Sequence, residues 1–114
     1  MKFQRMQKID HEIQRVLGTL ISQELKDPRM GFTTVTRVEV TQDLHHAKVF
    51  VSIIGDRHVA GQTMKALESA SRFIRGELGN MVKLRHTPEL HFVEDRTTER
   101  AIALSAALAK ANER

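Results

Sequence analysis

The sequence predicts an α+β domain in which a three-stranded mixed sheet carries helices on one of its faces. Apolar residues recur every three or four positions in residues 4–26 and 58–84, a spacing typical of amphipathic helices. Residues 32–40, 46–54 and 89–94 instead alternate with a period of two, and the first two of these segments are rich in β-branched residues. The length of 114 residues suits one such domain and is too short for two.

The first helix, expected over about residues 4–26, has one apolar stripe and ends at a proline. The residue before a proline is kept out of the α region, so Asp27-Pro28 ends the helix. Lys8 and Arg15 fall off the stripe, and we expect them to face solvent. The stripe consists of Ile9, Ile13, Val16, Leu17, Leu20 and Ile21.

Two strands follow, joined by the short polar segment 41–45, which indicates an antiparallel hairpin. Strict alternation places Val35 of the first strand on one face and Val38 on the other. A third strand over residues 89–94 follows the helical region, and we expect it to pair with the first strand through that long crossover. In the second strand, the alternation groups Ala47, Val49, Val51 and Ile53 on one face.

Residues 58–84 carry two apolar stripes, and the pattern alone permits one long helix that contains Gly76 and Gly79. The segment Gly76-Glu77-Leu78-Gly79 has the spacing of the G-x-x-G loop that clamps nucleic-acid backbone in KH domains. Leu78, however, continues an apolar stripe, and residue 77 is acidic, so we interpret the spacing as a chance match. From Thr97 on, a thin alanine-rich stripe predicts a last helix.

Several classes of protein are excluded by what the chain lacks. Without cysteine there is no disulfide framework, thiol nucleophile or cysteine-ligated metal. The six histidines show no familiar ligand spacing: His45 and His46 are adjacent, which on a strand turns them to opposite faces, and no H-E-x-x-H occurs. There is no P-loop, nucleophile elbow or buried carboxylate pair. We therefore expect no catalytic residue, metal, cofactor or small-molecule substrate.

The chain also lacks an apolar run near the roughly 18 residues of a membrane span, and its N-terminus lacks the apolar run of a signal peptide. We expect a cytoplasmic protein that does not contact a membrane.

The net charge of +4 is concentrated in two segments that are both predicted to be helical. Residues 1–26 carry a net charge of +2 and residues 57–88 carry +4, whereas the remaining segments are slightly acidic. Only 4% of the residues are aromatic, so the chain can hardly build a platform for stacking bases, and contacts with phosphates are the functional alternative to a merely solvated surface. The candidate phosphate contacts are Arg5, Lys8, Arg15, Lys65, Arg72, Arg75, Lys83 and Arg85.

Five blocks of sequence, in order and at compatible spacing, resemble the ribosome-binding factor A family of bacterial assembly factors for the small ribosomal subunit. The resemblance covers about residues 5–95. The blocks are Glu24-Leu25-Lys26-Asp27-Pro28-Arg29-Met30, Val38-Glu39-Val40-Thr41-Gln42-Asp43-Leu44, Ala47-Lys48-Val49-Phe50-Val51, Ala70-Ser71-Arg72-Phe73-Ile74-Arg75 and Leu84-Arg85-His86-Thr87-Pro88-Glu89-Leu90-His91-Phe92.

The resemblance implies a KH-like fold of order α-β-β-α-α-β, in which a helix-kink-helix at an Ala-x-Gly replaces the G-x-x-G loop. The matching positions are Ala70, Ser71 and Arg72, so an arginine stands where the family favours glycine. Either Arg72 adopts a costly positive φ, or the helices bend without it. We expect residues 1–95 to form the RNA-binding domain and residues 96–114 a C-terminal helical tail. Because the family often has a longer C-terminal extension, we expect any role of that extension to be reduced here.

The implied function is ribosome biogenesis without catalysis. Such a factor binds the free small (30S) subunit, contacts 16S rRNA and neighbouring ribosomal proteins, and assists maturation and folding of the rRNA near its 5′ end, above all in the cold. We expect a monomer. The alternatives are a generic KH-like module that binds other nucleic acids or proteins through its sheet face or last helix, and a small nuclease.

Overall fold

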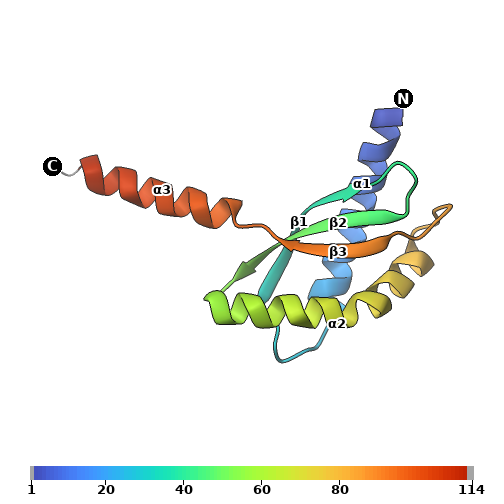
Figure 1. The fold of residues 1–114 in the computed structure, drawn as a ribbon, viewed down its shortest axis with the longest axis horizontal. Coiled ribbons are helices and arrows are strands. Elements are labelled where there is room, and N and C mark those ends of the chain that lie inside the picture. Colours follow the sequence, from blue (N-terminus) through green and yellow to red (C-terminus); the bar gives the residue numbers. More distant parts are fainter. Residues whose placement is uncertain (1, 113–114) are drawn as a thin grey trace.

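The computed structural model describes residues 2–112 and has the order of elements that the sequence predicts, with a single helix between the second and third strands. Figure 1 shows a twisted sheet, two helices packed with it, and a last helix that projects away from it. The elements are α1 (Lys2–Thr19), the π-helical turn η1 (Leu20–Glu24), β1 (Phe32–Val40), β2 (His46–Ile54), α2 (Arg57–Met81), β3 (Glu89–Glu94) and α3 (Thr97–Asn112).

The sheet is mixed, as expected, but the third strand pairs with the second strand rather than with the first. β1 is antiparallel to β2, and β3 is parallel to β2 on its other side. The expected pairing of β3 with β1 is therefore wrong. The reason is that β2, α2 and β3 form one β-α-β unit, whose helical crossover returns the chain beside the strand it left. Leu90 then lies opposite Ala47, and Phe92 opposite Val49.

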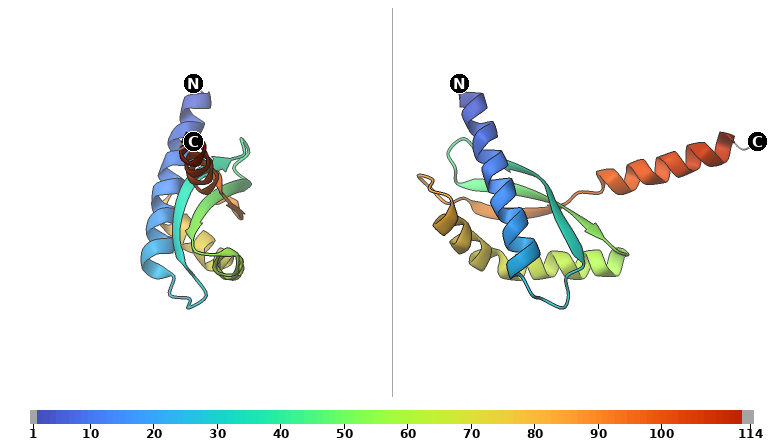
Figure 2. Two further views of the ribbon diagram at one scale, coloured as in Figure 1. Left: turned by 90° about the vertical axis from the view of Figure 1, so that its left-hand side faces the viewer. Right: turned by 180° about the vertical axis from the view of Figure 1, so that it is seen from behind.

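The core lies between the sheet and the two helices α1 and α2, and side chains from every strand and both helices contribute to it. α1 lies across one face of the sheet, and α2 passes beside the C-terminal end of α1 (Figure 2). The buried side chains of this cluster are Ile13, Val16, Leu17, Leu20, Ile21, Val35, Val38, Ala47, Val49, Val51, Leu67, Ile74, Leu78, Val82 and Leu90. The predicted stripe of the first helix is therefore its packed face. On α2 the prediction is wrong for Phe73 and Met81, which are 50% and 51% exposed, and on α3 Leu104 and Leu108 of the predicted stripe are exposed as well.

The strict alternation expected for β1 is wrong, because a β-bulge inserts one extra residue. Val35 pairs with Val51 and Arg37 with Phe50, so Thr36 has no partner of its own. The bulge brings Val35 and Val38 to the same buried face. The side-chain amide of Gln14 on α1 donates to the bulge carbonyls of Val35, at 3.4 Å, and Thr36, at 3.2 Å.

The helix between β2 and β3 is continuous through the positions where the resemblance places a corner. Residues 70–72 are helical, and among the described residues the only positive φ angles belong to Leu44 and Gly55. Figure 1 shows the ribbon of α2 bending past its middle without a break. Arg72 therefore avoids the left-handed region, whose cost for a residue with a Cβ is about 1–2 kcal/mol. The G-x-x-G segment lies inside this helix with Leu78 fully buried, which agrees with a chance match.

The loop between η1 and β1 is held to α2 by Thr63, a fully buried polar residue. The Thr63 hydroxyl donates to the Val59 carbonyl at 2.8 Å and accepts from the Gly31 amide at 2.9 Å. A Cβ on Gly31 would lie 2.6 Å from Cγ1 of Val59, so only glycine lets this loop approach the helix so closely.

Candidate nucleic-acid interface

The eight predicted cations are all exposed and come from two helices and one loop. Arg5, Lys8 and Arg15 lie on α1, and Lys65, Arg72 and Arg75 lie on α2. Lys83 and Arg85 lie in the loop between α2 and β3. Since α1 and α2 pack against the same core, the two basic segments of the sequence belong to the helical side of the molecule (Figure 2).

None of the eight cations forms a salt bridge with any side chain that the structure describes. Three arginines outside the candidate set do form such pairs. Arg29 pairs with Asp27 at 2.7 Å, Arg37 lies 3.3 Å from Glu39 and its guanidinium lies over the Phe50 ring, and Arg96 pairs with Glu94 at 2.7 Å. The predicted cations therefore keep their charge available to an outside partner such as a phosphate.

Arg72 and Arg75 border one shallow depression at the C-terminal half of α2, of about 530 Å³, which we call the α2 depression. The Arg75 guanidinium donates to the Thr87 carbonyl from Nε at 3.2 Å and from Nη2 at 2.8 Å. Arg75 therefore holds the loop before β3 against α2, a structural role that the sequence does not reveal. The depression is lined by Arg72, Arg75, Gly76, Gly79, Asn80 and Thr87.

Gly79 explains how the loop comes so close to the helix. A Cβ at this position would lie 2.9 Å from the Thr87 hydroxyl oxygen, whereas a Cβ on Gly76 would meet nothing within 4 Å. The hydroxyl and amide groups of Thr87 and Asn80 were missed by sequence reasoning. In the sequence, only Gly79 indicates that a loop packs closely here, because nothing else about its position in the helix calls for a glycine.

Arg15 borders a second hollow, of about 490 Å³, between α1 and the start of the β1 bulge. It is lined by His11, Gln14, Arg15, Gly18, Thr19, Ser22 and Val35. The remaining predicted cations border neither hollow. The structure thus brings Arg72 and Arg75 together, and places Arg15 at a separate point on the helical side.

One acidic side chain of α1 is turned toward the sheet. The carboxylate of Asp10 accepts from the Val40 amide at 3.1 Å, and partial burial raises its pKa, an effect that this hydrogen bond partly opposes. The Asp10 carboxylate therefore joins α1 to β1, and this partly buried position leaves it less able to neutralise the exposed cations Arg5 and Lys8 on the same helix.

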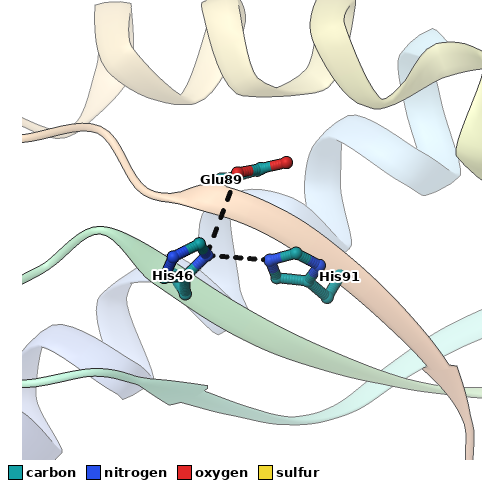
Figure 3. A group of neighbouring side chains, drawn as sticks. All are labelled: His46, Glu89 and His91. Atoms are coloured by element: carbon teal, nitrogen blue, oxygen red, sulfur yellow. Dashed lines mark hydrogen bonds and ion pairs between the residues drawn. The ribbon is translucent and has the colours of Figure 1, made fainter.

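A separate polar cluster lies on the opposite, outer face of the sheet, where sequence reasoning predicted no ligand set (Figure 3). His46 on β2 and His91 on β3 approach to 3.0 Å, and Glu89 lies 3.9 Å from His46. Sequence spacing could not reveal this cluster, because His46 and His91 are 45 positions apart and meet only through the parallel pairing of β2 with β3.

Known proteins resemble this chain over most of its length. A family model described as ribosome-binding factor A matches residues 5–108. A ribosome-binding factor A of Pseudomonas entomophila is 44% identical in an alignment of 112 positions that covers 96% of this chain and 85% of the relative. The crystal structure of that factor from Thermus thermophilus aligns with a TM-score of 0.71 at 28% identity, over 81% of this chain and 98% of the other. A homology model of the Thermus thermophilus factor, as fitted into a cryo-EM map of its 30S complex, aligns with a TM-score of 0.64 at 30% identity, over 75% of this chain and 90% of the other. None of the helices that the structure describes is long and apolar enough to cross a bilayer.

Proposed function

The chain belongs to the ribosome-binding factor A family, and from this premise we propose that it binds the free small ribosomal subunit. Membership in a family of ribosome-binding factors agrees with the expectation that it is not an enzyme. We further propose that it assists the folding and maturation of 16S rRNA near the 5′ end, above all at low temperature, and that it works as a cytoplasmic monomer.

The observation that carries the proposal is the set of exposed cations on the helical side, which have no carboxylate partner among the side chains that the structure describes. They lie on α1, on α2 and in the loop before β3. Contacts with phosphates position a protein on RNA but read no sequence, and the scarcity of aromatic residues leaves base stacking little part. The similarity to a factor that was fitted into a map of a 30S complex supports this choice of partner.

The two regions of the chain have different roles in the proposal. Residues 1–95 form the RNA-binding domain, with Ala70, Ser71 and Arg72 at the bend of α2. Residues 96–114 are the proposed C-terminal tail, whose helix α3 extends away from the sheet in Figure 1. We place the phosphate contacts at Arg5, Lys8, Arg15, Lys65, Arg72, Arg75, Lys83 and Arg85.

Binding of this kind favours one rRNA conformation without chemical turnover. A domain that contacts backbone in one arrangement of rRNA helices shifts the population toward that arrangement by its difference in affinity. If about six phosphates are neutralised, the logarithm of the association constant falls with the logarithm of the salt concentration with a slope of roughly −4 to −5.

The test is cosedimentation of the purified protein with 30S subunits, using a variant with Lys65→Glu, Arg72→Glu and Lys83→Glu. Arg75 stays intact, because its guanidinium also holds the loop before β3. The control is Lys48→Glu, a charge reversal at an exposed position on the outer face of the sheet. We expect the triple variant to lose association by at least about a hundredfold and the control to bind as the parent does.

Unchanged binding of the triple variant, or a salt slope near zero, would refute the electrostatic proposal. The alternative, a module that docks on proteins through its outer sheet face, is favoured by Phe32 and Ile54, which are paired across β1 and β2 and are 71% and 69% exposed. If Phe32→Ser abolishes association while the triple variant binds normally, that alternative holds.

The maturation step is tested separately in cells. In a strain that lacks its own copy, we expect this chain to lower the fraction of 16S rRNA with an unprocessed 5′ end at low temperature, and the triple variant to fail. Equal precursor levels with and without the chain would overturn the proposed role in maturation.

A further inference from the structure

We propose that His46, Glu89 and His91 form a zinc site on the outer face of the sheet (Figure 3). The inference does not depend on the proposed function, because the cluster lies on the face of the sheet opposite the helices that carry the predicted phosphate contacts. Two imidazoles and one carboxylate are a ligand set that Zn²⁺ takes in proteins.

The sheet itself positions the three side chains. In the parallel pairing of β2 with β3, His46 lies opposite Glu89, and Lys48 lies opposite His91. Residues two apart on a strand share a face, so Glu89 and His91 both turn outward beside His46, while Leu90 between them is buried. The cluster therefore follows from the register of two strands rather than from a flexible loop.

The start of β3 is anchored at this point. The Glu89 amide donates to the His45 carbonyl at 2.8 Å, and the preceding Pro88 is fully buried. Because backbone contacts fix where β3 begins, only the outer parts of the side chains have to move when an ion binds.

The distances between the ligand atoms bracket those of a tetrahedral zinc site. One ligand atom from each of the three residues can be chosen so that all lie within 4.8 Å of one another. Nδ1 of His46 lies 3.0 Å from Nε2 of His91 and 3.9 Å from Oε2 of Glu89. With zinc–ligand bonds of about 2.0–2.2 Å, neighbouring ligand atoms in a tetrahedron lie about 3.3–3.6 Å apart. The two distances from Nδ1 of His46 therefore lie within about half an ångström of the tetrahedral spacing, and rotation of the exposed Glu89 side chain adjusts the third.

The hydrogen bond between the two rings is compatible with metal binding. One ring nitrogen donates and the other accepts, and which ring donates depends on the tautomer. When Zn²⁺ binds, the donating ring carries its proton on its other nitrogen instead, so that both facing nitrogens offer lone pairs. The fourth position faces solvent, where water completes the coordination.

The charges around the cluster do not exclude a dication. Lys48 lies on the same face, two residues from His46, and its backbone is in register with that of Glu39 on β1. Glu39, Lys48, His46 and His91 line one open hollow of about 530 Å³. Glu39 is already paired with Arg37 at 3.3 Å, so Glu89 is the carboxylate that offsets the charge of the ion.

The test is titration of the metal-free, untagged protein with ZnCl2 by calorimetry, and with CoCl2 by absorbance. We expect one ion per chain, and for Co²⁺ the intense visible bands of a tetrahedral site. His46→Ala and His91→Ala should each weaken Zn²⁺ binding by at least about tenfold. His11→Ala and His58→Ala, which remove exposed imidazoles elsewhere, should leave the affinity unchanged.

Thermal unfolding followed by circular dichroism gives a second readout. We expect excess ZnCl2 to raise the melting temperature of the parent and not that of His46→Ala, because an ion that joins β2 to β3 stabilises only the folded chain. The substituted side chains are exposed, and Glu89→Gln provides a nearly isosteric third variant. The proposal is overturned if no ion binds, if the variants bind as the parent does, if the control variants lose as much affinity, or if MgCl2 competes equally, since Mg²⁺ prefers oxygen ligands.

Discussion

Replacing Thr63 by valine tests how the loop between η1 and β1 is held to α2. Valine has nearly the shape of threonine, so Thr63→Val removes the buried hydroxyl without creating a cavity. The Gly31 amide loses its acceptor. The Val59 carbonyl loses only one of two donors, because it also accepts a backbone hydrogen bond within α2.

The expected cost follows from the group that is left unpaired. A buried amide without a partner costs about 1–3 kcal/mol, and removal of the buried hydroxyl offsets part of this cost. We expect the free energy of unfolding to fall by about 1–2 kcal/mol, which lowers the urea midpoint by about 1 M for a slope of about 1–2 kcal/mol per M.

Circular dichroism is the appropriate probe of unfolding, because the chain has no tryptophan or tyrosine. Amide hydrogen exchange provides a local readout, and we expect the Gly31 amide to exchange faster in Thr63→Val. The control Thr34→Val makes the same change at an exposed position of β1 and should alter stability by less than about 0.5 kcal/mol. The reasoning fails if Thr63→Val is as stable as the parent and its Gly31 amide exchanges at the parental rate.

Two further predictions concern single residues. Gly55 has a φ of +144° and a Cβ there would lie 2.8 Å from Val59, so Gly55→Ala should cost about 1–3 kcal/mol. Gly61→Ala, in open space on α2, should stabilise by about 0.5–1 kcal/mol, and equal melting temperatures of the two variants would contradict this account. The Arg29 guanidinium and amide bonded to Asp27 lower the pKa of that carboxyl to about 2. This contribution to stability is therefore fully present above the ordinary value of 3.8 and is lost as the pH falls toward 2. An NMR titration should show that Arg29→Gln raises the Asp27 pKa, and an unchanged value would disprove the assigned cause.

The bounds of the strands could be predicted from local pattern, because strand alternation and turn residues are encoded within a few positions. All three strands have the predicted bounds. The stripe of the first helix is buried as expected, but its last turn is π-helical and ends at Glu24, where Leu25 is already extended before Asp27-Pro28. The long helix starts one residue earlier and ends three residues earlier than predicted.

For the candidate interface, the sequence predicted which residues carry the positive charge but not how they lie relative to one another. Charge distribution along the chain singled out the basic segments, and their exposure agrees with that interpretation. Arg75 borders the α2 depression and also donates to the Thr87 carbonyl. Both features depend on the loop before β3, which folds back onto α2. The contact spans 12 positions, and no local pattern encodes it.

By itself, the sequence determined the order and type of the elements, the buried faces of α1 and of β2, the uneven distribution of charge and the resemblance to a family. These properties depend on neighbours along the chain, through hydrophobic period, turn residues and the constraint of proline. Tertiary structure alone decided that β3 joins β2, that a bulge turns Val35 and Val38 to the same face, and that His46 meets Glu89 and His91. Each of these depends on strand register, which is settled by burial and hydrogen bonding between segments far apart in sequence.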